Sequence, residues 1–173
     1  MSGSKRDPAE VAWRIYDNLN DWTARVDTKA SIVLALETGA LALVVGLAGE
    51  GRTLNLGCVL ARWSLEIGVL FLCCAVVLAA LVVLPQLRRG HLSDETSKNF
   101  IYFGHLRNWK PEALAKQIGH DPDMVDQIST QIVIISKIVW RKHVWLQWSL
   151  YSLVAALVFI TPVLILGVAG GAT

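Results

Sequence analysis

The stretch SIVLALETGALALVVGLAG, from Ser31 to Gly49, is apolar along almost its whole length and decides the class of protein. A helix needs about 20 such residues to cross the hydrocarbon core of a bilayer. Two further runs, Trp63–Leu84 and Trp145–Val168, have the same apolar character. Since 54% of the 173 residues are apolar as well, the sequence predicts an all-α integral membrane protein with three transmembrane helices.

The distribution of Lys and Arg predicts the orientation of these spans. Five of the 16 cations lie before the first span, nine lie between the second and third spans, and two lie between the first and second. The positive-inside rule therefore places the N-terminus and the long loop in the cytoplasm. The expected boundaries are transmembrane helices over 31–48, 63–84 and 145–168, cytoplasmic segments over 1–30 and 85–144, an outer loop over 49–62 and an outer tail over 169–173.

Two long helices are expected to extend from the membrane into the cytoplasm. No Gly or Pro interrupts residues 9–38, and Pro8 suits a first helical turn, so the first span should continue an N-terminal amphipathic helix. A second apolar stripe runs in phase into the third span, with Asp121 and Pro122 at its start. The two stripes predict a cytoplasmic helical bundle formed by extensions of the first and third spans. They comprise Val11, Ile15, Leu19, Trp22 and Val26, and Met124, Ile128, Ile132, Ile135 and Val139.

Three local features of the remaining chain carry further expectations. The segment KPEALAKQIG predicts a short helix with Pro111 at its first position and Gly119 just past its end. In FIYFGHLRNW, Phe100–Trp109, Gly104 is expected to interrupt any helix. Pro162 predicts a kink or an early helix end in the third span, because it removes one backbone donor.

Glu37 is the acid inside the first span, where a charged side chain facing lipid costs at least about 3 kcal/mol. At 100° per residue it shares a face with Ile15, Leu19, Trp22, Val26 and Val33, so it should point into a helix bundle or a water-filled cavity and not into lipid. Tyr151 and Ser152 are at a similar depth, and we expect one of them to donate a hydrogen bond to it. Glu37 and Ser152 are therefore candidate gating residues. The opposite face has small residues that permit close helix contact: Ser31, Ala35, Gly39, Ala42 and Gly46.

Signatures of catalysis and metal binding are absent from the sequence. It contains no P-loop, no H-E-x-x-H, no nucleophile elbow and no dinucleotide fingerprint. The four histidines have no ligand-like spacing, and the three cysteines form neither a metal pattern nor a disulfide framework. We therefore expect no enzymatic activity, no cofactor, no metal and no nucleic-acid partner.

Two cytoplasmic segments are candidates for binding a small anionic ligand. In Phe100–Trp109, the rings of Tyr102, Phe103 and Trp109 could stack on a base, while His105 and Arg107 could donate to a phosphate. The alternative is that these aromatic residues pack against the bundle or the lipid headgroups.

The second candidate segment, Asp21–Ser31, lies just before the first span. Arg25 and Lys29 could form a basic ring around an anion together with three cations before the third span, Lys137, Arg141 and Lys142. Alternatively, Asp27 could pair with Lys137, Arg141 or Lys142.

Several motifs in this order resemble the membrane effector family of Pycsar antiphage systems. They are Trp22 with Asp27, Lys29, Ala30 and Ser31 leading into a span, Phe100–His105, and Gln127, Ser136 and Lys137 before the last span. The resemblance implies a multi-pass protein of the bacterial inner membrane. It also implies a cyclic pyrimidine mononucleotide ligand, cUMP or cCMP, made by a partner cyclase upon infection, and a homo-oligomer that impairs the membrane in abortive infection.

Two other functions are compatible with the residues. A membrane scaffold or assembly factor would use Phe100–Trp109 to dock a protein partner and would bind no nucleotide. A constitutive channel or transporter subunit is disfavoured because the spans contain few polar residues besides Glu37 and Glu66. Glu66 is expected to pair with Arg62, one turn away.

Overall fold

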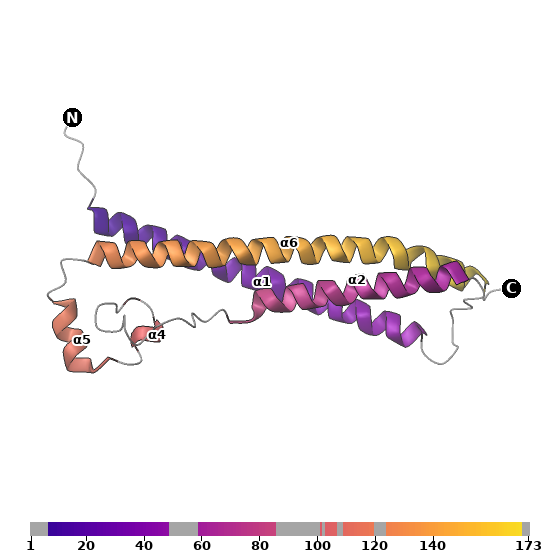
Figure 1. Cartoon of the computed structure of the whole chain (residues 1–173), viewed down its shortest axis with the longest axis horizontal. Coiled ribbons are helices and arrows are strands. Elements are labelled where there is room, and N and C mark those ends of the chain that lie inside the picture. The colour runs from indigo at the N-terminus through magenta and orange to yellow at the C-terminus, as the bar shows by residue number, and fades with distance from the viewer. Residues whose placement is uncertain are drawn as a thin grey trace, which may run out of the picture. The chain divides into compact units, whose positions relative to one another are not determined.

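The computed structural model describes residues 7–48, 59–85, 101, 103–106, 109–119 and 124–170. These residues form helices and contain no strand, which confirms the all-α class. The long helices α1, α2 and α6 are each apolar and long enough to cross a membrane, which confirms the three candidate spans. The helices are α1 (Pro8–Ala48), α2 (Val59–Val83), α4 (Phe103–Leu106), α5 (Pro111–Ile118) and α6 (Met124–Gly170) (Figure 1).

The two longest helices begin well before their apolar segments. Helix α1 is continuous from Pro8, as predicted, and Asp7 caps it by accepting a hydrogen bond from the Ala9 N–H at 3.0 Å. Helix α6 continues past Pro162 to Gly170, so the expected early end is wrong. One proline removes a single backbone donor, and a neighbouring helix can support the turn around it. The Ser64 hydroxyl of α2 does so by donating to the Phe159 carbonyl at 2.9 Å.

The short helices match the sequence in part. Helix α5 begins at Pro111 and is followed by Gly119, whose N–H donates to the Ala115 carbonyl at 3.3 Å, as predicted. Gly104, however, lies inside α4 and is buried, so the expectation that it interrupts any helix is wrong. The helical cost of a glycine is only about 1 kcal/mol, which packing can offset. The expected start of the later helix at Asp121 and Pro122 lies outside the described residues.

The chain divides into two compact units. The first comprises Met1–Ala24 and Pro85–Trp140, and the second comprises Arg25–Leu84 and Arg141–Thr173. In the first unit, Leu19 of α1 and Ile128 of α6 are buried. Ile15 and Trp22, predicted to face inward, are 44% and 57% exposed instead. The arrangement of the cytoplasmic bundle remains a prediction.

The second unit packs α1, α2 and the later part of α6 around two apolar clusters. One cluster joins Val26 and Ala30 of α1 to Val82 of α2 and Leu146 of α6. The other cluster joins later residues of α1 and α6 to earlier residues of α2. Its buried members are Val44, Leu65, Leu72, Ala156, Ile160 and Val163. Residue numbers rise together in α1 and α6 and fall in α2, so α1 runs parallel to α6 and α2 runs antiparallel to both.

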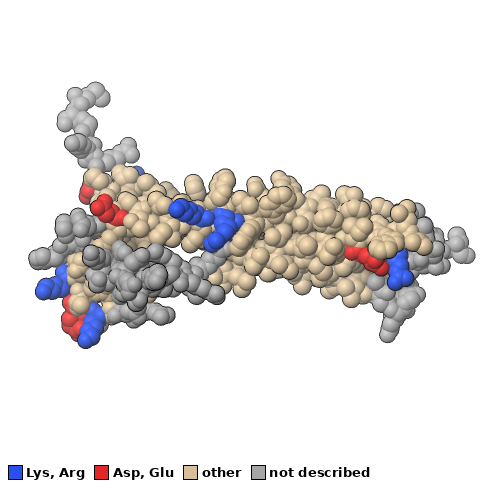
Figure 2. All heavy atoms as spheres, in the orientation of Figure 1, with Lys and Arg blue, Asp and Glu red and all other residues tan. Residues whose placement is uncertain are grey.

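The buried positions of α2 follow alternating steps of three and four residues, and those of α1 recur at steps of four or seven. On α2 they are Leu65, Gly68, Leu72, Ala75, Ala79 and Val82. This heptad spacing is typical of helices that pack at a shallow left-handed angle. Small residues allow close approach: a Cβ added at Gly68 would lie 2.5 Å from Ile160 Cγ1. Outside this seam, large apolar side chains are exposed, as expected for surfaces in contact with lipid. Figure 2 shows that much of the surface of the long helices bears no charged side chain.

Candidate functional site: polar contacts between the long helices

Glu37 is a fully buried carboxyl group in the apolar part of α1. The Ser149 hydroxyl of α6, which is also fully buried, donates to Glu37 Oε1 at 2.7 Å. The second oxygen, Oε2, is buried and has no hydrogen-bond partner among the described residues. The inward orientation predicted for Glu37 is therefore confirmed. One side of its carboxyl group is satisfied, and the other is open to a new donor.

The partner of Glu37 differs from the one expected. Depth counted from the ends of the predicted spans indicated Tyr151 or Ser152, whereas the donor is Ser149, one turn earlier on α6. Tyr151 is 63% exposed and contacts Trp148 edge-to-face, so it faces away from the seam. Ser152 is half-buried on the same helix. The error arises because the count assumed that residues 31 and 145 lie at the same depth, whereas the register between α1 and α6 places Ser149 against Glu37.

The Glu37–Ser149 contact lies between the two apolar clusters along both helices. Along α1, Glu37 falls between Ala30 of one cluster and Val44 of the other. Along α6, Ser149 falls between Leu146 and Ala156. A single polar layer thus interrupts an otherwise apolar seam. Buried polar residues at seam positions fix the register of packed helices, because a shifted register would leave them unsatisfied.

A second polar contact joins α1 to α6 nearer their N-terminal ends. Lys142 Nζ donates to Asp27 Oδ1 at 2.5 Å. The Lys142 side chain is 6% exposed and that of Asp27 is 38% exposed, so the pair lies at the edge of the packed region. This confirms one of the predicted pairings for Asp27. Nearby, the Arg141 guanidinium lies over the Trp145 ring at 5.4 Å from its centroid.

The predicted pair of Arg62 and Glu66, near the N-terminal end of α2, is confirmed as well. Arg62 Nε donates to Glu66 Oε1 at 3.3 Å, one turn away on the same helix. Both side chains are more than half exposed. Unlike the two contacts between α1 and α6, this pair lies within one helix and does not connect it to another.

The candidate ligand residues are placed as follows. Arg25 and Lys29 are exposed on α1 in the second unit, and Lys137 is exposed on α6 in the first unit. Trp109 lies before α5 in the first unit, and its indole Nε1 is buried without a hydrogen-bond partner among the described residues. Phe103 and His105 lie in α4, whereas Tyr102 and Arg107 lie outside the described residues.

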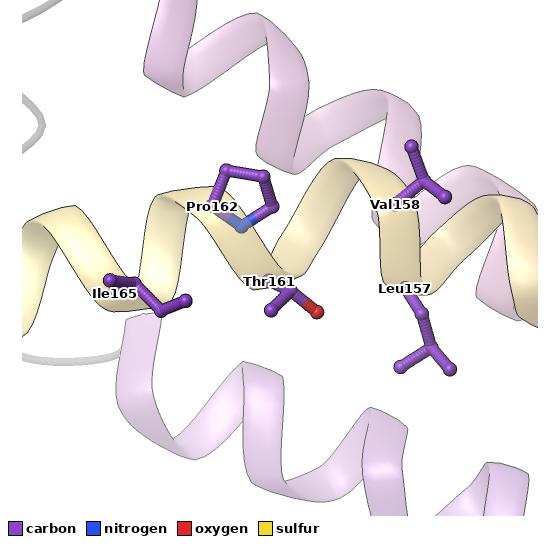
Figure 3. Close-up of a pocket in the computed structure, with 5 residues that line it drawn as sticks. All are labelled: Leu157, Val158, Thr161, Pro162 and Ile165. Atoms are coloured by element: carbon purple, nitrogen blue, oxygen red, sulfur yellow. The ribbon is translucent and has the colours of Figure 1, made fainter.

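One apolar groove lies on the surface of α6 around Pro162. Its lining side chains project from this single helix, and Leu157, Val158 and Ile165 are each at least half exposed (Figure 3). Thr161 is the one lining residue with a polar side chain. The lining suits contact with an apolar surface such as lipid, and it offers no charge to a soluble ligand. No group of three metal-ligating side chains occurs among the described residues.

Three long apolar helices, with polar contacts buried between two of them, define a multi-pass helical membrane protein. Comparison with known proteins specifies the class further. A family profile described as Pycsar effector protein domain matches residues 11–169, and the chain therefore belongs to this family. The match extends from the first turns of α1 to the end of α6. No curated protein and no solved structure matches the chain.

Membership of the family makes the protein an antiphage defence effector. The family also implies a paired cyclase and a cyclic nucleotide signal, and the spans imply a lipid bilayer. The Pycsar effector family is not a known enzyme family. The hydrogen bond from Ser149 to Glu37 was not evident from any motif, although the heptad spacing of small and apolar residues could have revealed the seam that holds it.

Proposed function

We propose that this protein binds a cyclic pyrimidine mononucleotide, cUMP or cCMP, on the cytoplasmic side of the bacterial inner membrane. Binding causes an oligomer of the protein to impair that membrane, which ends phage infection by arresting or killing the cell. The observation that carries the proposal is the family match, which extends over all three candidate spans and the segments between them. The excess of Lys and Arg before the first span and in the long loop supports a cytoplasmic N-terminus.

The ligand is proposed to bind the unit that contains the aromatic segment. Trp109 supports this assignment, because its buried indole N–H has no acceptor among the described residues and could donate to a carbonyl oxygen of the base. Lys137 belongs to the same unit, and its exposed ammonium could hold the phosphate. Tyr102, Phe103, His105 and Arg107 remain candidates for the same pocket.

An oligomer is needed because one protomer with three spans cannot enclose a water-filled path. The small-residue face of α1 supports close contact between copies. Every member of it is exposed, and a Cβ added at Gly39 or Gly46 would meet nothing within 4 Å. Small residues let helix backbones approach closely in membranes.

Glu37 is proposed to couple ligand binding to the membrane segments. Its unpartnered Oε2 supports this role, because a small movement of α6 could supply a second donor, with Ser152 half-buried along the same helix. The variant Glu37→Gln keeps the size of the side chain and replaces the ionisable carboxyl group by an amide. We expect it to change ligand-triggered dye release from vesicles. Unchanged release would remove any functional role for the acid.

Calorimetry on the detergent-purified full chain tests ligand binding with cUMP, cCMP, cAMP and cGMP. The expected result is selective binding of a pyrimidine nucleotide, weakened about ten-fold or more by Trp109→Leu or Lys137→Ala, since each removes a proposed contact. Lys116→Ala is the control, because Lys116 is an exposed cation of the same unit. If a well-folded oligomer binds none of the four nucleotides, the scaffold function replaces this proposal.

A further inference from the structure

Arg25 and Lys29 are two cations one turn apart on α1 that have no anionic partner among the described residues. Both are exposed. The acid between them, Asp27, is already engaged by Lys142 of α6. Residues four apart on a helix lie on the same face, so both cations can reach one anion.

The face of α1 that bears these cations continues as an apolar stripe. Ile32, Leu36 and Leu43 follow at helical spacing, and they are 57%, 66% and 62% exposed. Large apolar side chains exposed along a membrane span contact acyl chains. Arg25 and Lys29 therefore mark the point where a lipid-exposed face ends.

Neighbouring contacts give the depth of the two cations. Val26 and Ala30, adjacent to them on α1, pack with Leu146 and Trp145 of α6. At the same level the Arg141 guanidinium lies over the Trp145 ring. Tryptophan and basic side chains gather where the hydrocarbon core meets the headgroups. The aromatic and basic residues of α6 thus indicate that Arg25 and Lys29 lie at headgroup depth.

We propose that Arg25 and Lys29 bind the phosphate of an anionic phospholipid headgroup in the leaflet on the N-terminal side of the spans. The planar guanidinium can donate two hydrogen bonds to the phosphate, and the ammonium adds a second positive charge. The acyl chains of the same lipid would lie along the stripe that begins at Ile32. A soluble nucleotide has phosphate too, but it has no apolar tail for that stripe. The proposal therefore reassigns both cations from the nucleotide site to lipid, and it does not depend on nucleotide sensing.

Native mass spectrometry of the full chain with equimolar phosphatidylglycerol and phosphatidylcholine tests the site. The unmodified protein should retain phosphatidylglycerol preferentially. The double variant Arg25→Gln/Lys29→Gln should lower that preference by about 25-fold, since each cation near an anionic headgroup changes affinity by roughly five-fold. Lys110→Gln/Lys116→Gln is the control, because it removes the same charge at exposed positions of the first unit, which does not contain the stripe. The control should leave the preference unchanged.

Three results would overturn the proposal. One is the absence of any phosphatidylglycerol preference in the unmodified protein, and another is an equal loss in the control, which would indicate net charge alone. The third is displacement of phosphatidylglycerol by cUMP or cCMP, which would assign the cations to the nucleotide phosphate. Circular dichroism melting checks that the double variant is folded. If it melts lower, Arg25→Gln and Lys29→Gln are measured singly, and each should lower the preference about five-fold.

Discussion

The three helices of the second unit are held together in two different ways. Around Gly68 and Ile160 the contact depends on shape, because the missing side chain of a glycine makes room for a bulky one. Around Glu37 and Ser149 it depends on one buried hydrogen bond. Lipid is as apolar as the residues that it replaces, so close packing and polar contacts, and not hydrophobic burial, decide how these helices associate. A shape-based contact has one good arrangement. The Glu37–Ser149 contact also fixes one register, but the unpartnered Glu37 Oε2 could accept a hydrogen bond from a second donor after a small movement of α6. The apolar cluster is thus suited to anchoring, and the polar layer permits one defined rearrangement.

The largest effect should come from filling the glycine contact. Gly68→Ala puts a Cβ 2.5 Å from Ile160 Cγ1 and 3.2 Å from Phe159 Cβ, so the helices must move apart. We expect a loss of about 2 kcal/mol in thermal unfolding of the detergent-solubilised protein. Gly119→Ala is the control, because the nearest atom to its added Cβ would lie at 3.6 Å and Gly119 has a right-handed helical conformation. It should be neutral or stabilising, since alanine favours helix. Equal effects would mean that Gly68 is not a packing contact.

A smaller effect on stability is expected from breaking the polar contact between Glu37 and Ser149. Ser149→Ala removes the donor to Glu37 and leaves the buried carboxyl group without any partner among the described residues. Hydrogen bonds between membrane helices contribute about 1 kcal/mol, and we expect a loss of this size in the same unfolding assay. Ser152→Ala removes the same hydroxyl from a half-buried position on the same helix. If it costs as much as Ser149→Ala, the hydrogen bond to Glu37 has no special weight.

The pair at the edge of the packed region should matter less than the polar layer. Lys142→Met keeps the apolar length of the side chain and removes the charge that contacts Asp27. Since the Asp27 side chain is 38% exposed, water can replace part of the lost contact, and we expect a loss of about 0.5 kcal/mol. Lys137→Met, at an exposed position of α6, provides the comparison. A loss larger than that of Ser149→Ala would reverse the ranking of the two polar contacts.

The smallest effect on stability is expected from the Arg62–Glu66 pair, which lies within the single helix α2. Arg62→Gln breaks the 3.3 Å contact with Glu66, whose side chain is 54% exposed. Exposed pairs one turn apart contribute about 0.3 kcal/mol, and high salt should abolish even that difference. A large, salt-independent change in the melting temperature would show that this pair makes contacts beyond its own helix.

Much of the fold could be predicted from the sequence because it depends on length and composition. The three apolar runs, the uninterrupted residues after Pro8 and the Pro111 and Gly119 signals each correspond to an observed helix. The cost of a charge in lipid was enough to predict that Glu37 points inward. Each of these inferences depends only on the sequence of a single helix.

Features that depend on two helices could not be predicted in the same way. Trp22 was placed on the buried face, but it lies about 60° around the helix from Leu19, and this offset leaves it 57% exposed while Leu19 is buried. The seam itself was difficult to recognise because it includes Gly68, Ala75 and Ala79, which give a weak apolar signal. The choice of Ser149 as partner to Glu37 depends on the register between α1 and α6, which neither helix specifies alone.

The central claim is that a cyclic pyrimidine nucleotide makes this protein impair a membrane. The most direct measurement is dye release from phospholipid vesicles that contain the full-length protein, with cUMP, cCMP, cAMP or cGMP on the side of its N-terminus. The account predicts release with cUMP or cCMP, little release with the two purine nucleotides, and none from vesicles without protein. Dye retention with all four nucleotides in vesicles that contain folded, oligomeric protein would contradict the claim.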